Sequence, residues 1–248
     1  ARKGRNLVLL LAIAEDVYGI SFLNLDGKKY YTIDDPKGSE GYYTFPQKFS
    51  PESQSCSIMM REKIELVNKQ LSSVRRLTSK RYPQLSVETQ VDKNLMDLYS
   101  NYPKCKWDMY ASTPMSDLLS DDLLPTLKEC IAGKSEIESA NMLINFVQTA
   151  FEYMTDGEQF GYERPFFVDE TFYYPYSDCE DRAILYSNLV RRLLHLDVVL
   201  LHYPKHLATA VRFTSDVEGD YVMVNGQKYT VCDPTYIGAD IGEAMPQF

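Results

Sequence analysis

Three residues in the second half of the chain combine types and positions that suit nucleophilic catalysis. Cys179 lies in the first turn of a helix predicted from a Ser177–Glu180 capping box, where unpaired backbone amides stabilise a thiolate. His206 opens one predicted strand and Asp233 ends another. A cysteine nucleophile needs an imidazole as its base, and the imidazole needs a group that orients it. The order Cys179, His206, Asp233 therefore predicts a triad for acyl chemistry, with amides of the helix start forming part of an oxyanion hole.

The residues around Cys179 make the proposed imidazole essential. Acidic side chains at Asp178, Glu180 and Asp181 raise the pKa of a neighbouring thiol by like-charge repulsion. His195 cannot compensate for them, because it lies sixteen residues further along the same helix, roughly 24 Å away. We therefore assign the base to His206.

A zinc site is the alternative use of these side chains. His202 and His206 are four residues apart and, with Cys179 and Asp233, imitate a ligand set. The chain has no Cys-x-x-Cys or His-Glu-x-x-His pattern, so we expect neither a metal nor a cofactor. The cysteines that lack such a context are expected to be structural; they are Cys56, Cys105, Cys130 and Cys232.

The first part of the chain has the pattern of strands. Residues 7–14 form a continuous apolar run, and residues 18–25 and 28–33 flank an Asp-Gly pair that favours a tight hairpin. Residues 36–57 are rich in Gly, Pro, Ser and Tyr and predict a loop. The segment 64–77 fits either a helix or a strand. We expect a β-rich N-terminal region.

The second part predicts helices followed by strands. A Ser135–Glu138 capping box begins a helix with apolar residues at helical spacing, and a second helix runs from the nucleophile to about His195. Apolar runs at 198–203 and 207–213 precede a hairpin centred on an Asn-Gly pair. This order predicts an α+β fold in which helices pack on an antiparallel sheet.

Charge and composition limit the classes of function. The chain has 248 residues and a net charge of −9, with 44% hydrophobic and 25% charged residues, as in folded globular proteins. Residues 1–110 carry 17 basic and 13 acidic side chains, whereas residues 111–248 carry 9 and 22. We expect one region at 1–104 and another at 105–248, and no nucleic-acid partner. The longest apolar run has eight residues, far below the ~20 needed to span a bilayer.

Three segments resemble a known family. They are Asp178-Cys179-Glu180-Asp181-Arg182-Ala183-Ile184-Leu185, His206-Leu207-Ala208-Thr209-Ala210-Val211 and Cys232-Asp233-Pro234-Thr235. Together they look like the transglutaminase-like superfamily of papain-fold cysteine enzymes, over about residues 151–236. Ser177 stands where many members have Gly. The resemblance implies a papain-like core with Cys179 as nucleophile, His206 as general base and acid, and Asp233 as the orienting carboxylate.

The superfamily contains several activities. The resemblance implies a protein or peptide substrate, and we expect a peptidase or amidase, because transamidation needs a site that excludes water. A true transamidase is one alternative, and a binding or scaffold protein that keeps the fold without turnover is another. Bacterial members often work outside the cytoplasm, which favours an extracytoplasmic location. The sequence leaves the oligomeric state open.

Overall fold

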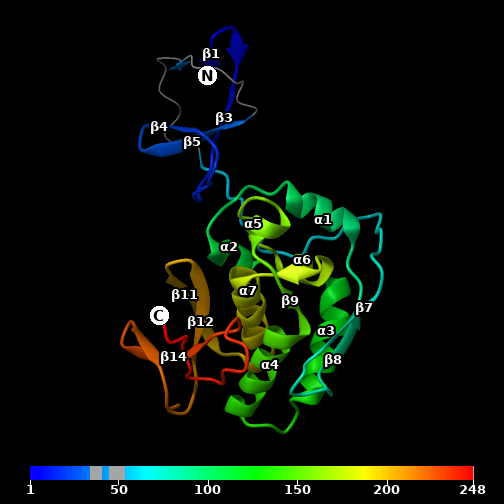
Figure 1. Cartoon of the computed structure of the whole chain (residues 1–248). Helices are drawn as coiled ribbons and strands as arrows, with labels where there is room; N and C mark the ends of the chain where they lie inside the picture. The colour runs from blue at the N-terminus through cyan, green and yellow to red at the C-terminus, as the bar shows by residue number, and fades with distance from the viewer. Residues whose placement is uncertain (34–40, 45–53, 248) are drawn as a thin grey trace. The chain divides into compact units, whose positions relative to one another are not determined.

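The structure is a computed structural model that describes residues 1–33, 41–44 and 54–247. Contacts divide the chain into two compact units, one of residues 1–60 with 103–106 and one of residues 61–102 with 107–248 (Figure 1). This division differs from the boundary expected between residues 104 and 105. Residues 61–102 belong to the second unit because their apolar side chains, Leu85 and Leu95 among them, are buried there.

The first unit consists of short strands. Strands β1 (Arg2–Lys3), β2 (Asn6–Leu7) and β6 (Tyr42–Tyr43) form one antiparallel sheet in the order β2-β1-β6. Strands β3 (Leu9–Ala12), β4 (Phe22–Leu25) and β5 (Lys28–Ile33) form another in the order β3-β5-β4. A small core of Ile13, Val17 and Tyr31 lies beside the second sheet.

The expected hairpin in this unit is confirmed. Strands β4 and β5 pair across Asp26 and Gly27, which both have positive φ, as the Asp-Gly pair predicts. The expected strand at 7–14 is shorter and less buried, since Leu9 is 65% exposed. The loop expected at 36–57 lies largely outside the described residues.

The second unit begins with a β-hairpin followed by three helices. Strands β7 (Arg75–Thr78) and β8 (Ser86–Thr89) pair, and β8 packs against α3. The segment 64–77 contains no helix, and only its last residues join a named strand. The helices are α1 (Lys93–Ser100), α2 (Trp107–Ser112) and α3 (Asp117–Cys130).

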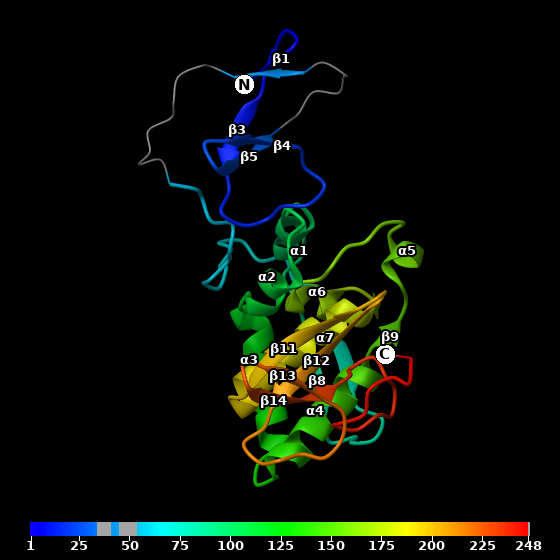
Figure 2. The same cartoon turned by 90° about the vertical axis from the view of Figure 1, so that its left-hand side faces the viewer.

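Helices α4 and α7 form the centre of the second unit. Helix α4 (Glu136–Ala150) begins at Ser135, whose hydroxyl and the Glu138 carboxylate make the expected reciprocal capping box. Strand β9 (Glu152–Tyr153), helix α5 (Asp156–Gln159), helix α6 (Val168–Tyr173) and strand β10 (Tyr176–Ser177) lead to α7 (Cys179–Leu189). One π-helical turn (Val190–Leu194) continues α7. Helices α2, α4 and α6 all pack on α7 (Figure 2).

A four-stranded antiparallel sheet completes this unit. Strands β11 (Asp197–Tyr203), β12 (His206–Arg212), β13 (Tyr221–Val224) and β14 (Gln227–Cys232) lie in the order β11-β12-β14-β13. Helix α7 packs against β12, a central strand whose residues are all buried except Arg212. The expected Asn225-Gly226 hairpin joins β13 and β14. The α+β class, the antiparallel sheets and the β-rich N-terminal region are thus confirmed.

Helix lengths in the described part of the chain also bear on membranes. None of these helices has the length and apolar character needed to cross a bilayer.

Candidate functional site

The start of α7 places Cys179 at the first position of the helix. The predicted Ser177–Glu180 capping box is wrong by one residue, because Ser177 belongs to β10 and pairs with Tyr153 of β9 in parallel. Asp178 is the N-cap instead. Its carboxylate accepts the Asp181 N–H, and its own N–H donates to Asp181 Oδ2 over 3.1 Å. The parallel strand pair and this box fix where the helix begins.

His206 and Asp233 form a buried hydrogen-bonded pair. His206 Nε2 lies 2.7 Å from Asp233 Oδ2, and the side chains are 6% and 2% exposed. Asp233 Oδ1 accepts the N–H groups of Thr235 and Tyr236, at 2.9 and 3.2 Å. These bonds hold the carboxylate in place. The imidazole therefore presents its Nδ1 edge away from the carboxylate.

The Cys179 thiol lies at the same end of β12. Its sulfur donates to Glu180 Oε2 over 3.1 Å. Burial, and then the charge of Glu180, raise the pKa of this thiol well above its usual range, while the Leu207 amide acts in the opposite direction. His206 is the first residue of β12, and Leu207 directly follows it. The contact of the Leu207 amide with the thiol therefore places Cys179, in the first turn of α7, near the strand end that carries the imidazole.

The other two histidines lie elsewhere. His195 ends the π-helical turn in a left-handed conformation. His202 of β11 pairs with Leu207 of β12, and its ring contacts Trp107 at 4.8 Å between centroids. Paired residues share a face of the sheet, so His202 lies on the same face as Leu207. Neighbouring residues on a strand point to opposite faces, so His206 lies on the other face and His202 does not join it. The expected zinc ligands His202, His206, Cys179 and Asp233 do not form one group: in the part of the chain that the structure describes, no cluster of side chains close enough to share a metal contains a histidine.

The remaining cysteines form no disulfide. Cys105 and Cys232 are buried, Cys130 is half-buried and Cys56 is exposed. Burial raises the pKa of the Cys130 thiol.

Gln148 of α4 binds the main chain of the segment that carries Asp233. Its side-chain amide donates to the carbonyl oxygens of Asp233, Tyr236 and Ala239, at 3.1, 2.8 and 3.1 Å. The sequence gives no signal for this role, because a glutamine in an amphipathic helix is typical of a solvated position. Gln148 is only 1% exposed.

A buried guanidinium lies beneath the start of α7. Arg182 donates to the carbonyl oxygens of Gln148 and Phe151, at 3.2 and 2.9 Å, and to Ser177 Oγ at 3.3 Å. It also lies over the Tyr153 ring, 5.3 Å from the centroid. Its hydrogen bonds therefore fasten the end of α4 to the entry of α7.

Carboxylates gather around the nucleophile. Single oxygens of Asp156, Glu163, Asp178 and Glu180 all lie within 4.8 Å of one another. Burial raises the pKa of Asp156 to about 7 and that of Asp178 to about 8, and it also raises the pKa of Glu180. The sequence pointed to the acidic residues beside Cys179 but not to Glu163.

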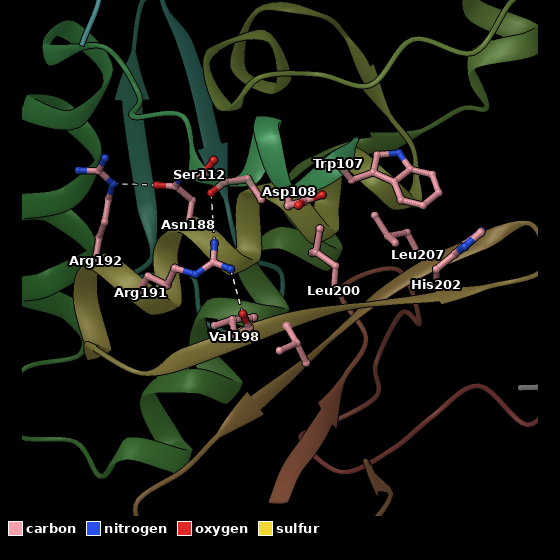
Figure 3. Close-up of a pocket in the computed structure, with 12 residues that line it drawn as sticks. Trp107, Asp108, Ser112, Asn188, Arg191, Arg192, Val198, Leu200, His202 and Leu207 are labelled. Carbon is pink, nitrogen blue, oxygen red and sulfur yellow. Dashed lines mark hydrogen bonds between the residues drawn. The ribbon is translucent and has the colours of Figure 1, made fainter. Parts of the chain in front are cut away.

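A cavity of about 750 Å³ opens between α2, α7 and β11. In Figure 3, Trp107, Leu200, His202 and Leu207 gather at one end, and Asn188, Arg191 and Arg192 lie at the other. Arg191 donates to the carbonyl oxygens of Ala111 and Val198, at 3.1 and 2.9 Å, and so joins α2 to β11. Leu207 links the cavity to the thiol, because its side chain lines the cavity and its amide faces the Cys179 sulfur.

Comparison with family models, with curated protein sequences and with solved structures finds no match to this chain.

Proposed function

We propose that the second unit is a cysteine-dependent acyl-handling enzyme with a papain-like, transglutaminase-like core. Cys179 is the nucleophile, His206 the general base and acid, and Asp233 the orienting carboxylate. The observation that carries the proposal is the buried 2.7 Å bond between His206 and Asp233 at the strand end whose next amide faces the Cys179 sulfur. The resemblance of the three sequence segments to this superfamily points to the same residues.

The electrostatics of the site favour a particular form of the mechanism. The resting sulfur is a thiol that donates a hydrogen bond to Glu180. His206 therefore removes the proton as the sulfur attacks the substrate carbonyl. The imidazolium then protonates the departing amine, and a thioester with Cys179 remains. Water, activated by the neutral imidazole, resolves the thioester. Asp233 stabilises the imidazolium formed in each half of the reaction.

Peptide or side-chain amides of proteins are the proposed substrates. The cavity supports this choice, because its 750 Å³ accommodates a side chain or a short peptide segment and one of its lining residues, Leu207, directly follows His206. Its apolar end, formed by Trp107, Leu200 and Leu207, would receive an apolar group flanking the scissile bond. Hydrolysis is preferred to transamidation because water is the abundant acceptor.

One observation supports a second candidate, a binding protein without turnover. Burial and Glu180 hold the pKa of the Cys179 thiol high, which disfavours the thiolate that cysteine enzymes use. In such a protein the cavity between α2 and β11 would be the binding site, and the thiol would be inert.

Labelling with an electrophilic acyl probe distinguishes the two candidates. The proposed enzyme is labelled at Cys179, the Cys179→Ala variant is not labelled there, and the Cys130→Ala variant is labelled like the parent. His206→Ala abolishes labelling, whereas His195→Asn, at a histidine outside both the proposed triad and the cavity, preserves it. Equal labelling of parent and His206→Ala would exclude the proposed base.

A further inference from the structure

Strand β11 forms one edge of the four-stranded sheet. The sheet has the order β11-β12-β14-β13, and the pairing of β11 with β12 is continuous over all its seven residues. Natural sheet edges are usually protected from further pairing by lysine, proline or a bulge. The sequence of β11 between its first and last residues is Val-Val-Leu-Leu-His, which contains neither of these residue types. This edge is therefore a template on which another extended segment can pair.

The backbone groups that face outward from this edge can be assigned from one hydrogen bond. The Val198 carbonyl accepts from Arg191 Nη2 over 2.9 Å, so it points away from β12. Because the direction of the N–H and C=O groups alternates along an antiparallel strand, those of Leu200 and His202 also point away from β12. Among the residues that the structure describes, none forms a hydrogen bond with these outward groups of Leu200 and His202.

The cavity of about 750 Å³ adjoins these outward groups, because Leu200 and His202 both line it. Trp107 also lines it, on the face of the sheet that carries the His202 side chain, since the two rings are in contact. Figure 3 shows that the cavity follows β11 from an apolar end at Trp107 to a cationic end at Arg191 and Arg192. The cavity thus combines a strand edge, an aromatic wall and a positive charge.

Arg192 is the cationic group that remains available at this end. Its Nε donates to Asn188 Oδ1 over 2.8 Å, and no carboxylate of the described ranges lies within 4.0 Å of its guanidinium. The buried Asp169 senses its charge but is bound to the N–H and hydroxyl of Ser116. Arg191, in contrast, is occupied by main-chain carbonyls. A guanidinium in this position suits a carboxylate that a ligand brings into the cavity.

We propose that the cavity binds an extended peptide segment that adds to β11 as an antiparallel strand and carries a carboxylate to Arg192. The added strand exchanges N–H···O bonds with Leu200 and His202. Antiparallel pairing is the more stable kind per residue, and it makes the peptide run from the Trp107 end toward Arg192. The inference takes from the proposed function only that the ligand is a peptide.

The register of β11 also predicts which peptide side chains are recognised. Residues that pair across strands share a face, so the peptide residue opposite His202 lies beside Trp107 and should be apolar. Val198, which marks the cationic end, lies four residues from His202, or ~13 Å along the strand. We therefore expect an apolar residue followed four positions later by Asp or Glu. Asp108, next to Trp107, repels an acidic residue from the apolar end.

The chain contains a single tryptophan, so the emission of Trp107 reports on the cavity alone. The probe is the synthetic peptide Ser-Phe-Thr-Val-Thr-Glu-Ser, which contains no tryptophan or tyrosine. It is added to the whole chain carrying Cys179→Ala, which cannot consume it through the proposed nucleophile. Binding should shift the Trp107 emission to shorter wavelength in a saturable manner.

Modified peptides test the bonds to the strand edge and the direction of pairing. N-methylation of the valine, which lies opposite Leu200, removes a donor and should weaken binding at least about tenfold. N-methylation of the preceding threonine, whose N–H points away from β11, is the matched control and should have little effect. The peptide with the reversed sequence, Ser-Glu-Thr-Val-Thr-Phe-Ser, should bind at least about tenfold more weakly, because it brings no carboxylate to Arg192.

Protein variants test the charge pair. Arg192→Gln should weaken binding of the probe at least about tenfold, and it should bind the probe and its Glu-to-Gln analogue alike. Lys128→Gln removes a positive charge at an exposed position of α3 outside the cavity and should bind like the parent. The melting temperature of each variant shows whether its fold is retained.

Three results would overturn the proposal. One is an unchanged Trp107 emission at peptide concentrations up to about 1 mM. Another is equal weakening, or none, by the two N-methyl groups, which would exclude pairing with β11. The last is equal binding of the probe by the parent and a folded Arg192→Gln, or equal or tighter binding of the reversed peptide. Failure of the proposed catalysis would leave these titrations unchanged, and failure of peptide binding would leave labelling of Cys179 by the acyl probe unchanged.

Discussion

The buried carboxyl of Asp156 gives a prediction about stability that needs no knowledge of a substrate. Burial raises its pKa from an ordinary 3.8 to about 7, with the Arg164 N–H acting in the opposite direction. Because the folded-state pKa is the higher one, the folded chain keeps a proton that the unfolded chain has released. The stabilisation is complete at a pH below the unfolded pKa and is lost as the pH rises through about 7.

The magnitude follows from the two pKa values. The difference between 3.8 and about 7 corresponds to about 4 kcal/mol of unfolding free energy lost between about pH 4 and pH 7, of which about 3 kcal/mol is lost above pH 5. Asp178 shifts in the same direction, with a pKa of about 8. Because the two groups interact, we expect the combined loss to remain below the sum of the separate effects. A loss of ~4 kcal/mol lowers the melting temperature of a chain of this size by about 10 °C.

The assay is urea unfolding in EDTA at several pH values between about 5 and 8. Asp156→Asn keeps an oxygen that accepts the Arg164 N–H but cannot ionise, so it should remove most of the decrease in stability with pH. Asp122→Asn, at an exposed position of α3, is the matched control and should retain the parent's slope. If Asp156→Asn and the parent lose the same free energy over this pH range, the carboxyl is not the group that titrates and the reasoning is refuted.

Three further predictions concern other residues of the second unit. Gln148→Ala leaves three carbonyl oxygens without their donor, and we expect a loss of ~2–4 kcal/mol of unfolding free energy in urea titrations. An unchanged urea midpoint would mean that water replaces the amide. Gly219→Ala should cost ~2–4 kcal/mol of unfolding free energy, because Gly219 has a φ of +115° and its added Cβ would meet the backbone of Gly242. In Gly157→Ala the added Cβ meets nothing within 4 Å, so this variant should be nearly neutral. Equal melting temperatures for the two variants would contradict the prediction. Iodoacetamide at pH ~7.5 should modify Cys179 at least about tenfold more slowly in His206→Ala than in the parent, as mass spectrometry can measure, and equal rates would show that the imidazole does not assist the thiol.

A capping box or a turn dipeptide in the sequence correctly predicts the start of one helix and the turns of two hairpins. The Ser135–Glu138 capping box begins α4 as expected, and the Asp-Gly and Asn-Gly pairs turn their hairpins. At α7 the same reasoning misplaces the cap by one residue. Two overlapping boxes are possible there, and the pairing of Ser177 with β9, which lies more than twenty residues upstream, decides between them.

The site itself is predictable only in part. The sequence order gives His206 and Asp233 as partners, and the structure brings these two side chains together. The burial of Gln148 and the convergence of Asp156 with Asp178 arise from the packing of α4, α5 and α7, which no local pattern encodes. The catalytic role of these residues and the papain-like core remain predictions.

The contacts of Gln148 also determine when the site can form during synthesis. The ribosome completes α4 and α7 well before it adds Asp233 and the segment up to Ala239, whose carbonyl oxygens bind Gln148. Domains begin to fold as the chain emerges, so Cys179 can occupy its helix while its imidazole still lacks the orienting carboxylate. A nascent chain that ends before Asp233 therefore has the proposed nucleophile without its complete triad, which would keep the thiol from reacting with neighbouring proteins before synthesis has passed this point.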